Sequence, residues 1–225
     1  RQATLNAIEA FLGGDKFDFL FSITNPLLLP IKVLGKANRL AINYHDGPLP
    51  RYAGVHATSW AILNGESEHG ITWHAMEADA DTGRILVQRR FDVPADATAF
   101  TLNTRCFEEA FLGFVQLTER LRAGDLSGSE QRLEDRTYFA KHQKPAGGGV
   151  IDWNRSGNEI LRLIRACDFG QVPNGFATAK LALPDAMLVV RSAKIVELNQ
   201  PASPGTIIAD SPSLVVATSD GALKI

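Results

Sequence analysis

The chain has few of the residues that build disulfide frameworks, metal clusters or membrane spans. Its 225 residues include only two cysteines, Cys106 and Cys167, far apart and without a CxxC pattern. Such a pair predicts neither a disulfide framework nor a structural zinc site. No run approaches the roughly 18 apolar residues of a membrane helix, and the first ten residues lack the charged-then-apolar order of a secretory signal. We therefore expect a cytoplasmic protein with no metal centre and no membrane contact.

An excess of charge of one sign is also missing. Lys and Arg total 23 against 25 Asp and Glu, a formal net charge of -2. No strong global field would attract nucleic acid, so such binding would need a local basic patch. Apolar residues make up 45% of the chain, which is enough to fill the core of one large domain, or of a large and a small one.

Helical and strand patterns alternate over the first 130 residues. We expect helices at 2–12, 31–34 and 55–63 and a long helix from Thr98 or Thr101 to Gly124, and strands at 17–23, 39–43, 69–76 and 84–93. This order indicates an α/β architecture with a mostly parallel sheet, to which a hairpin at 69–93 would add antiparallel character.

The composition changes after Gly149. A helical pattern at 160–164 is followed, over 176–225, by short β-prone pieces separated by Pro, Gly, Ser and Asp, as in a small barrel. We predict a catalytic domain at 1–130, a linker at 131–150 and a helix-plus-barrel domain at 151–225. The chain starts on a helix and stops inside a strand-like run. We therefore expect it to be truncated at both ends, with N-terminal strands missing.

Asn43 and His45 are the first candidates for chemistry. Side chains two apart in a strand point to one face, so both can act on one atom. They stand where a buried strand ends, and open α/β sheets bind ligands outside the carboxyl ends of their strands. The alternative interpretation is that both residues only stabilise the bend at Asp46-Gly47.

Asp81 is the third candidate. Its loop, Glu77–Gly83, joins two predicted strands and could return a carboxylate to the same sheet edge, where it would orient and charge His45. The alternative is a solvated acidic turn. A calcium loop does not fit, because Arg90 stands where the bidentate Glu belongs.

Taken together, these motifs resemble the formyltetrahydrofolate-dependent formyltransferases, which include methionyl-tRNA formyltransferase and the amine-formylating domains of sugar and nonribosomal peptide pathways. The matching residues are, in order, Asn43-Tyr-His45, Leu49-Pro50, Gly54, Gly70–Met76, Asp81-Thr-Gly83 and Ile85, then Ile151-Asp-Trp153, Ile164–Ala166 and Pro204–Thr206. The resemblance implies a Rossmann-like formyltransferase domain followed by an OB-like β-barrel domain.

The loop after His45 departs from the family pattern. The family commonly has Ser-Leu-Leu-Pro and later Arg-Gly, whereas this chain has Gly47-Pro-Leu-Pro50 and Ala53-Gly54. The absence of an arginine at 53 counts against methionyl-tRNA as the acceptor. The loop is more similar to the formylation domains attached to peptide-synthetase or adenylating modules.

The resemblance implies formyl transfer from 10-formyltetrahydrofolate to an amine. In this reaction Asn43 would donate a hydrogen bond to the oxyanion, His45 would move the amine proton, and Asp81 would hold the tautomer of His45. The expected acceptor is an amino acid or an aminoacyl group, carried on a carrier protein. An amino sugar, a free amine and an aminoacyl-tRNA remain alternatives.

We expect the folate to be bound by two loops. The candidate residues are Ile23, Leu27, Leu28, Leu29, Ala78 and Asp79. The three leucines could equally be packing at the start of a helix. We expect His74 to be a supporting group and not a catalyst. A formyltetrahydrofolate hydrolase, which would use the same three residues with water, and a folate-binding module without activity are the competing functions.

Overall fold

The computed structural model describes residues 2–198 and 200–225. The chain divides into two compact units. The first contains the residues up to 57 together with 68–92 and 104–141, and the second contains 58–67, 93–103 and 142–225. Each unit is described by itself below.

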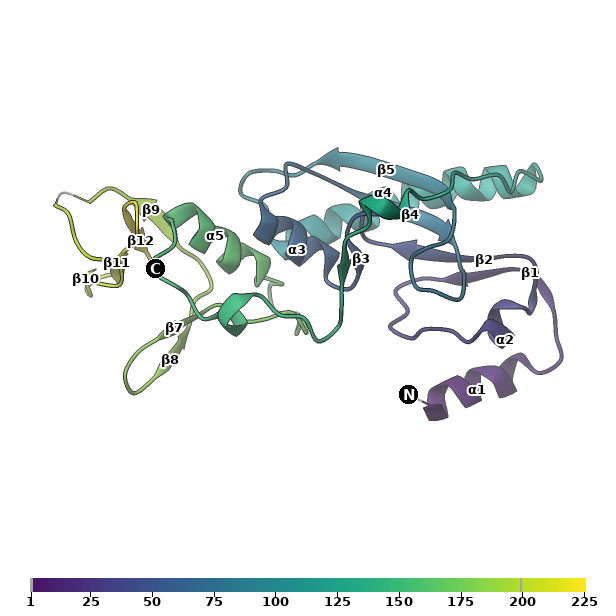
Figure 1. Cartoon of the computed structure of the whole chain (residues 1–225), viewed down its shortest axis with the longest axis horizontal. Helices are drawn as coiled ribbons and strands as arrows, with labels where there is room; N and C mark the ends of the chain where they lie inside the picture. Colours follow the sequence, from purple (N-terminus) through teal and green to yellow (C-terminus); the bar gives the residue numbers. More distant parts are fainter. Residues whose placement is uncertain (1, 199) are drawn as a thin grey trace. The chain divides into compact units, whose positions relative to one another are not determined.

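A four-stranded sheet forms the centre of the first unit (Figure 1). Its strands, in spatial order, are β1 (Phe17–Ser22), β2 (Ala37–His45), β4 (Glu68–Ala75) and β5 (Ile85–Asp92). β1 and β2 are parallel, whereas β2–β4 and β4–β5 are antiparallel. The sheet is therefore mixed, with one parallel pair among its described strands. The short loop between β4 and β5 requires the chain to return in the opposite direction, as expected for a hairpin.

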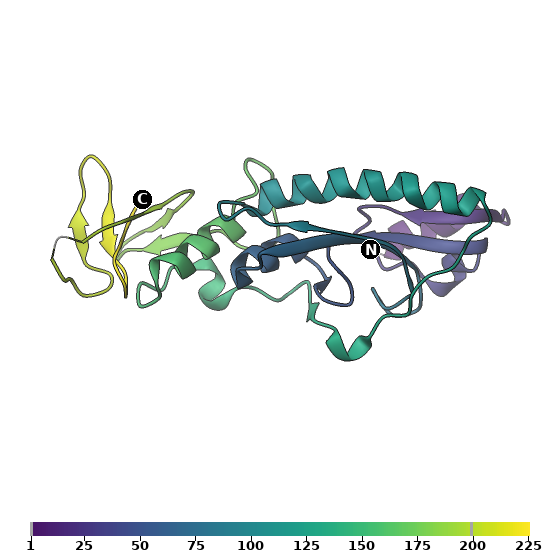
Figure 2. The ribbon, with the colours of Figure 1, turned by 90° about the horizontal axis from the view of Figure 1, so that it is seen from above.

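The long helix α4 (Ala99–Arg122) lies along one face of this sheet (Figure 2). Thr98 and Thr101 begin it with reciprocal hydrogen bonds, each hydroxyl accepting from the other's backbone amide. The buried core between helix and sheet consists of Ile42, Tyr44, Ile71, Trp73, Leu86, Val87, Cys106, Ala110, Leu117 and Leu121. Because side chains alternate along a strand, Asn43, His45 and His74 lie on the opposite face.

Three shorter helices confirm the other helical predictions in this part of the chain: α1 (Gln2–Leu12), α2 (Ile31–Leu34) and α3 (Ala57–Asn64). A short pairing was not predicted. β3 (Ala53–Gly54) lies parallel to β6 (Tyr138–Phe139), which follows the 3-10 turn η1 (Leu133–Asp135). Another 3-10 turn, η2, spans Ala146–Gly149.

The second unit contains the predicted helix and small β-domain. α5 (Gly157–Ala166) begins with a capping box between Ser156 and Glu159. β9 (Lys194–Val196), β10 (Ile207–Ala209), β11 (Val215–Ala217) and β12 (Ala222–Lys224) form an antiparallel sheet, and β7 (Lys180–Ala182) pairs with β8 (Met187–Val189). Ile160, Ile164 and Leu223 fill the core. Within the described residues, no helix is both long and apolar enough to span a membrane.

Candidate active site

The site is built at the end of β2 from three neighbouring strands. Asn43 is in register with Ser22 of the parallel strand β1 and with His74 of the antiparallel strand β4. His45 is in register with Thr72. These residues share the sheet face that α4 leaves free, so the polar groups on β2 and β4 come together by register alone.

Asp81 reaches this cluster from the loop between β4 and β5. Its Oδ1 lies 3.9 Å from Nδ1 of His45 and 3.5 Å from Nε2 of His74. Its Oδ2 accepts a hydrogen bond of 2.8 Å from the amide of Gly54. The structure thus brings the three predicted residues into one cluster, in which Asn43 joins the others through His74: its Nδ2 lies 3.2 Å from the His74 Nε2.

The Asp81 carboxylate is largely buried, with its side chain 12% exposed. Burial alone would raise its pKa. The neighbouring imidazoles of His74 and His45 and the hydrogen bond from the Gly54 amide outweigh burial and hold the pKa of Asp81 well below its usual range. The carboxylate is therefore a fixed negative charge beside two imidazoles.

His45 is arranged to accept a proton. Its Nε2 lies 2.7 Å from the carbonyl oxygen of Tyr52, and since a carbonyl can only accept, Nε2 carries a hydrogen. Its Nδ1 faces Asp81. Both partners are acceptors, so both contacts strengthen when the ring becomes an imidazolium. Nδ1 is the nitrogen left to exchange a proton. Gly47 permits this arrangement, because a methyl group there would stand 2.8 Å from Nε2 of His45.

His74 contacts both Asn43 and Asp81, and neither contact was predicted from the sequence. Its Nδ1 donates to the carbonyl oxygen of Ala75 at 2.8 Å, so in the neutral ring Nε2 is free to accept from the Asn43 amide. His74 therefore decides which way the Asn43 amide turns. The alternation of residues 71–75 predicts that His74 shares a strand face with Thr72. It does not predict the register between β2 and β4 that places His74 beside Asn43.

Backbone strain is concentrated in the loops around the site. Among the described non-glycine residues, positive φ angles occur at Thr24 (51°), Tyr52 (60°), His56 (60°) and Asp81 (59°). Such conformations cost on the order of 1–3 kcal/mol each and persist only where the surroundings impose them. They lie in the loops that follow β1, β2, β3 and β4. Two of them, Tyr52 and Asp81, contact His45 directly, so part of this strain belongs to the site itself.

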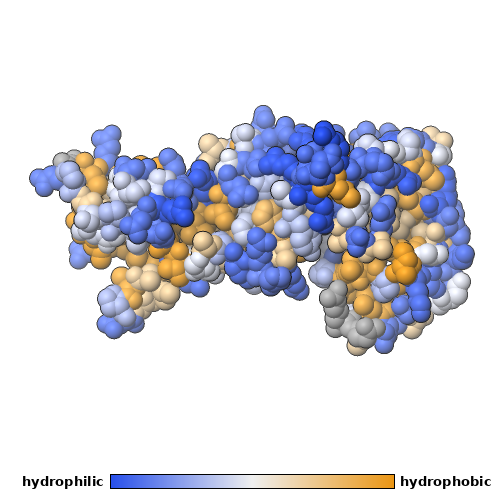
Figure 3. All heavy atoms as spheres, in the orientation of Figure 1, coloured by the Kyte–Doolittle hydropathy of each residue, from blue (hydrophilic) through white to orange (hydrophobic). Residues whose placement is uncertain are grey.

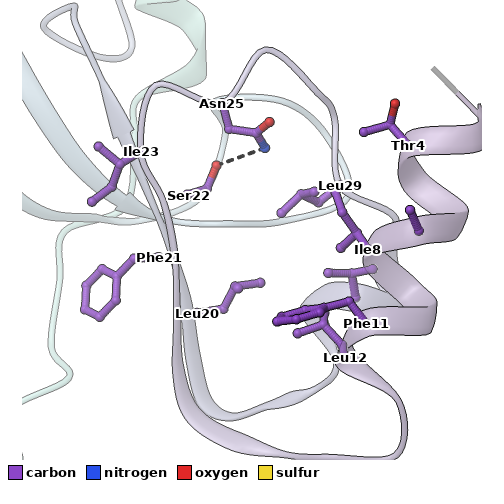
Figure 4. Close-up of a pocket in the computed structure, with 12 residues that line it drawn as sticks. Thr4, Ile8, Phe11, Leu12, Leu20, Phe21, Ser22, Ile23, Asn25 and Leu29 are labelled. Atoms are coloured by element: carbon purple, nitrogen blue, oxygen red, sulfur yellow. Dashed lines mark hydrogen bonds between the residues drawn. The ribbon is translucent and has the colours of Figure 1, made fainter.

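A cavity of about 450 Å³ lies between α1, β1 and the loop after β1 (Figure 4). In the close-up, Ile8, Leu12, Leu20 and Leu29 approach one another across it, and Asn25 bonds to Ser22 at 3.3 Å. Figure 3 shows hydrophobic residues at the surface in the region of α1. Phe11, which belongs to this helix, is 89% exposed.

Two of the six residues predicted to bind folate, Ile23 and Leu29, line this cavity. Leu27, Leu28, Ala78 and Asp79 are not among its lining residues. Leu28 is 49% exposed, so it does not pack as a buried residue at a helix start. Ala78 and Asp79 lie exposed on the loop that carries Asp81.

The cysteines take no part in the cluster. Cys106 and Cys167 are free thiols, and burial raises the pKa of both. Within residues 2–198 and 200–225, no group of three or more His, Cys, Asp or Glu side chains could hold a metal ion.

Comparison with known proteins identifies related sequences and folds. Residues 15–118 match the family model described as formyl transferase, and residues 146–225 match the one described as formyl transferase, C-terminal domain.

Several solved structures share the fold. HypX from Aquifex aeolicus, in complex with tetrahydrofolic acid, matches with a TM-score of 0.75 and 21% identity over 100% of this chain and 37% of its own. An N-formyltransferase from Helicobacter canadensis, bound to folinic acid and dTDP-3-aminofucose, has a TM-score of 0.69, 20% identity and coverage of 91% and 71%. A 4-N formyltransferase from Francisella tularensis has a TM-score of 0.69, 20% identity and coverage of 83% and 74%. The chain spans about a third of the length of the HypX chain that it matches.

Proposed function

We propose that this chain, which belongs to the formyltransferase family, transfers the formyl group of 10-formyltetrahydrofolate to an amine. The observation that carries the proposal is the contact of Asp81 with His45 and His74, and of His74 with Asn43, at the end of β2. An amide donor, a proton acceptor and a fixed carboxylate are the groups that acyl transfer to an amine requires.

Asn43 acts on the carbonyl. The amine attacks the formyl carbon, and the carbonyl oxygen becomes an oxyanion. The Asn43 amide, held by His74, donates a hydrogen bond to that oxygen. In comparable sites the loss of one such donor lowers the rate by about 10²–10³.

His45 and Asp81 handle the proton. The attacking amine becomes positively charged, and its proton passes to Nδ1 of His45, where the Asp81 carboxylate stabilises the imidazolium. The bond between the formyl carbon and N10 then breaks, and the proton goes to N10. The products are the formamide and tetrahydrofolate. No covalent enzyme intermediate forms.

The folate lies between two loops in this proposal. Ile23, Leu27, Leu28 and Leu29 supply an apolar wall, and the backbone at Ala78 and Asp79 supplies polar groups for the pterin. Two facts support this: the first loop follows Ser22, which is in register with Asn43, and Ile23 and Leu29 line a cavity.

The acceptor is proposed by class. The motif Asn43–Gly54 favours an amino acid or an aminoacyl group on a carrier protein. The Helicobacter canadensis structure holds dTDP-3-aminofucose, so a nucleotide-linked amino sugar is the second candidate. An aminoacyl-tRNA is the third.

The test is release of tetrahydrofolate from 10-formyltetrahydrofolate with a panel of amines from these classes. We expect release that depends on one class, and a loss of about 10²–10³ in kcat for Asn43→Ala and His45→Ala. Asn154→Ala, a change of an exposed asparagine outside the cluster, serves as the control. Formate release without any amine would indicate a hydrolase. Folate binding without turnover, or normal turnover in both variants, would contradict the proposal.

A further inference from the structure

We propose that residues 129–139, called the strap here, position the Asp81 carboxylate for the proposed reaction. The sequence predicts a linker at 131–150. The hydrogen bonds of residues 129–139 reach both loops that form the site, and they converge on the bond between Gly54 and Asp81. The inference rests on the proposed function for its catalytic part only.

The first arm of the strap holds the Asp81 loop. Ser129 and Ile85 exchange two backbone hydrogen bonds of 2.8 and 2.9 Å directly after that loop. The side-chain amide of Gln131 donates to the carbonyl oxygens of Asp81 (3.0 Å) and Gly83 (2.7 Å). Asp81 has a φ of 59°, so its backbone needs such support to keep the carboxylate directed at the imidazoles.

The second arm holds the Gly54 loop. The hydroxyl of Thr137 accepts from the Tyr52 amide at 2.8 Å, and its carbonyl accepts from the Ala53 amide at 2.9 Å. The contact is close: a methyl group on Gly54 would stand 2.2 Å from the carbonyl oxygen of Phe139. Only glycine fits between the strap and Asp81.

The two loops that the strap holds are joined by one hydrogen bond. The Gly54 amide donates to Asp81 Oδ2 at 2.8 Å, although the two residues are far apart in sequence. Tyr52, whose amide the strap holds, also provides the carbonyl that receives Nε2 of His45. The strap therefore fixes the partners of both polar edges of the His45 ring.

The strap is not optimised for stability alone. Gln131 Oε1 and Arg136 Nε are buried without a hydrogen-bond partner among the described residues. Unsatisfied buried polar atoms are destabilising. A segment that served only to connect could avoid this cost with apolar or exposed residues, whereas the Gln131 amide group is needed for its two donor contacts.

The experiment uses Gln131→Ala and Thr137→Val, one variant for each arm. Gln116→Ala is the matched control, because Gln116 is an exposed glutamine on α4. We expect kcat to fall about tenfold in each strap variant, with the KM for the folate within twofold, and no change in the control. In an Asp81→Asn background Gln131→Ala should cause no further loss, since it acts through Asp81. An additive loss would overturn the proposal.

A second measurement does not depend on turnover. Hydrogen exchange at the Gly54 amide reports the bond to Asp81 directly. We expect exchange at least about tenfold faster in both strap variants and unchanged in Gln116→Ala. Unchanged exchange in the strap variants would overturn the proposal even if the protein proves inactive with every acceptor, whereas faster exchange in an inactive protein would leave the positioning role standing and refute only the proposed function.

Discussion

Replacing Asp81 by asparagine removes one charge from the site while retaining an oxygen that can accept from the Gly54 amide. The carboxylate lies 3.9 Å from Nδ1 of His45. At an effective dielectric constant of about 20, a unit charge pair at this distance interacts by about 4 kcal/mol. The side chain is 12% exposed, so solvent screens little of this interaction.

If the imidazolium of His45 forms in the rate-limiting step, the loss of 4 kcal/mol corresponds to roughly a 10³-fold decrease in kcat. The KM for the folate should change little, because the charge acts on the proton transfer. Steady-state kinetics with the acceptor from the amine panel measures both. Glu77→Gln is the control: it removes an equal charge from an exposed position of the same loop. A kcat within threefold of wild type, or an equal loss in the control, would refute the reasoning.

The Asp81→Asn variant should also differ from wild type in how its unfolding free energy depends on pH. Since the folded-state pKa of Asp81 lies below its ordinary value of ~3.9, its contribution to the unfolding free energy is fully present above that pH and is lost as the pH falls through the folded pKa. Wild type should therefore lose more stability below about pH 4 than Asp81→Asn does. Denaturant titrations from pH 7 to pH 2.5 test this, and parallel curves for the two proteins would contradict it.

Three further predictions concern other parts of the chain. His74→Leu should lower kcat by about 10²-fold in wild type and cause no further loss in Asn43→Ala, because it acts through that amide; additive losses would show a separate role. Gly54→Ala should lower the unfolding free energy by at least about 2 kcal/mol, since a methyl group would stand 2.2 Å from a backbone oxygen at a φ of 98°. Thermal unfolding measures it, and Gly14→Ala, with nothing within 4 Å, is the control. Burial raises the pKa of Cys167 to about 12, so it should react with an aromatic disulfide reagent at pH 8 far more slowly in the folded than in the unfolded protein. Equal rates would argue against its burial.

The sheet shows which features the hydrophobic periodicity of the sequence predicts and which it does not. The strand at β2 and the hairpin at β4–β5 were readable from local patterns, and the structure contains both. The sequence did not predict how many strand pairs are parallel, because the pairing of β2 with β4 depends on a contact between segments far apart in the chain.

By itself the sequence determined that Asn43 and His45 share one face of a strand, because the alternation of side chains along a strand is a local property. Only the tertiary structure decided that His74 stands beside Asn43, that Tyr52 receives the second nitrogen of His45, and that Gln131 supports Asp81. The physical reason is that strand order, register and loop packing are non-local, and no single segment records which others it will meet.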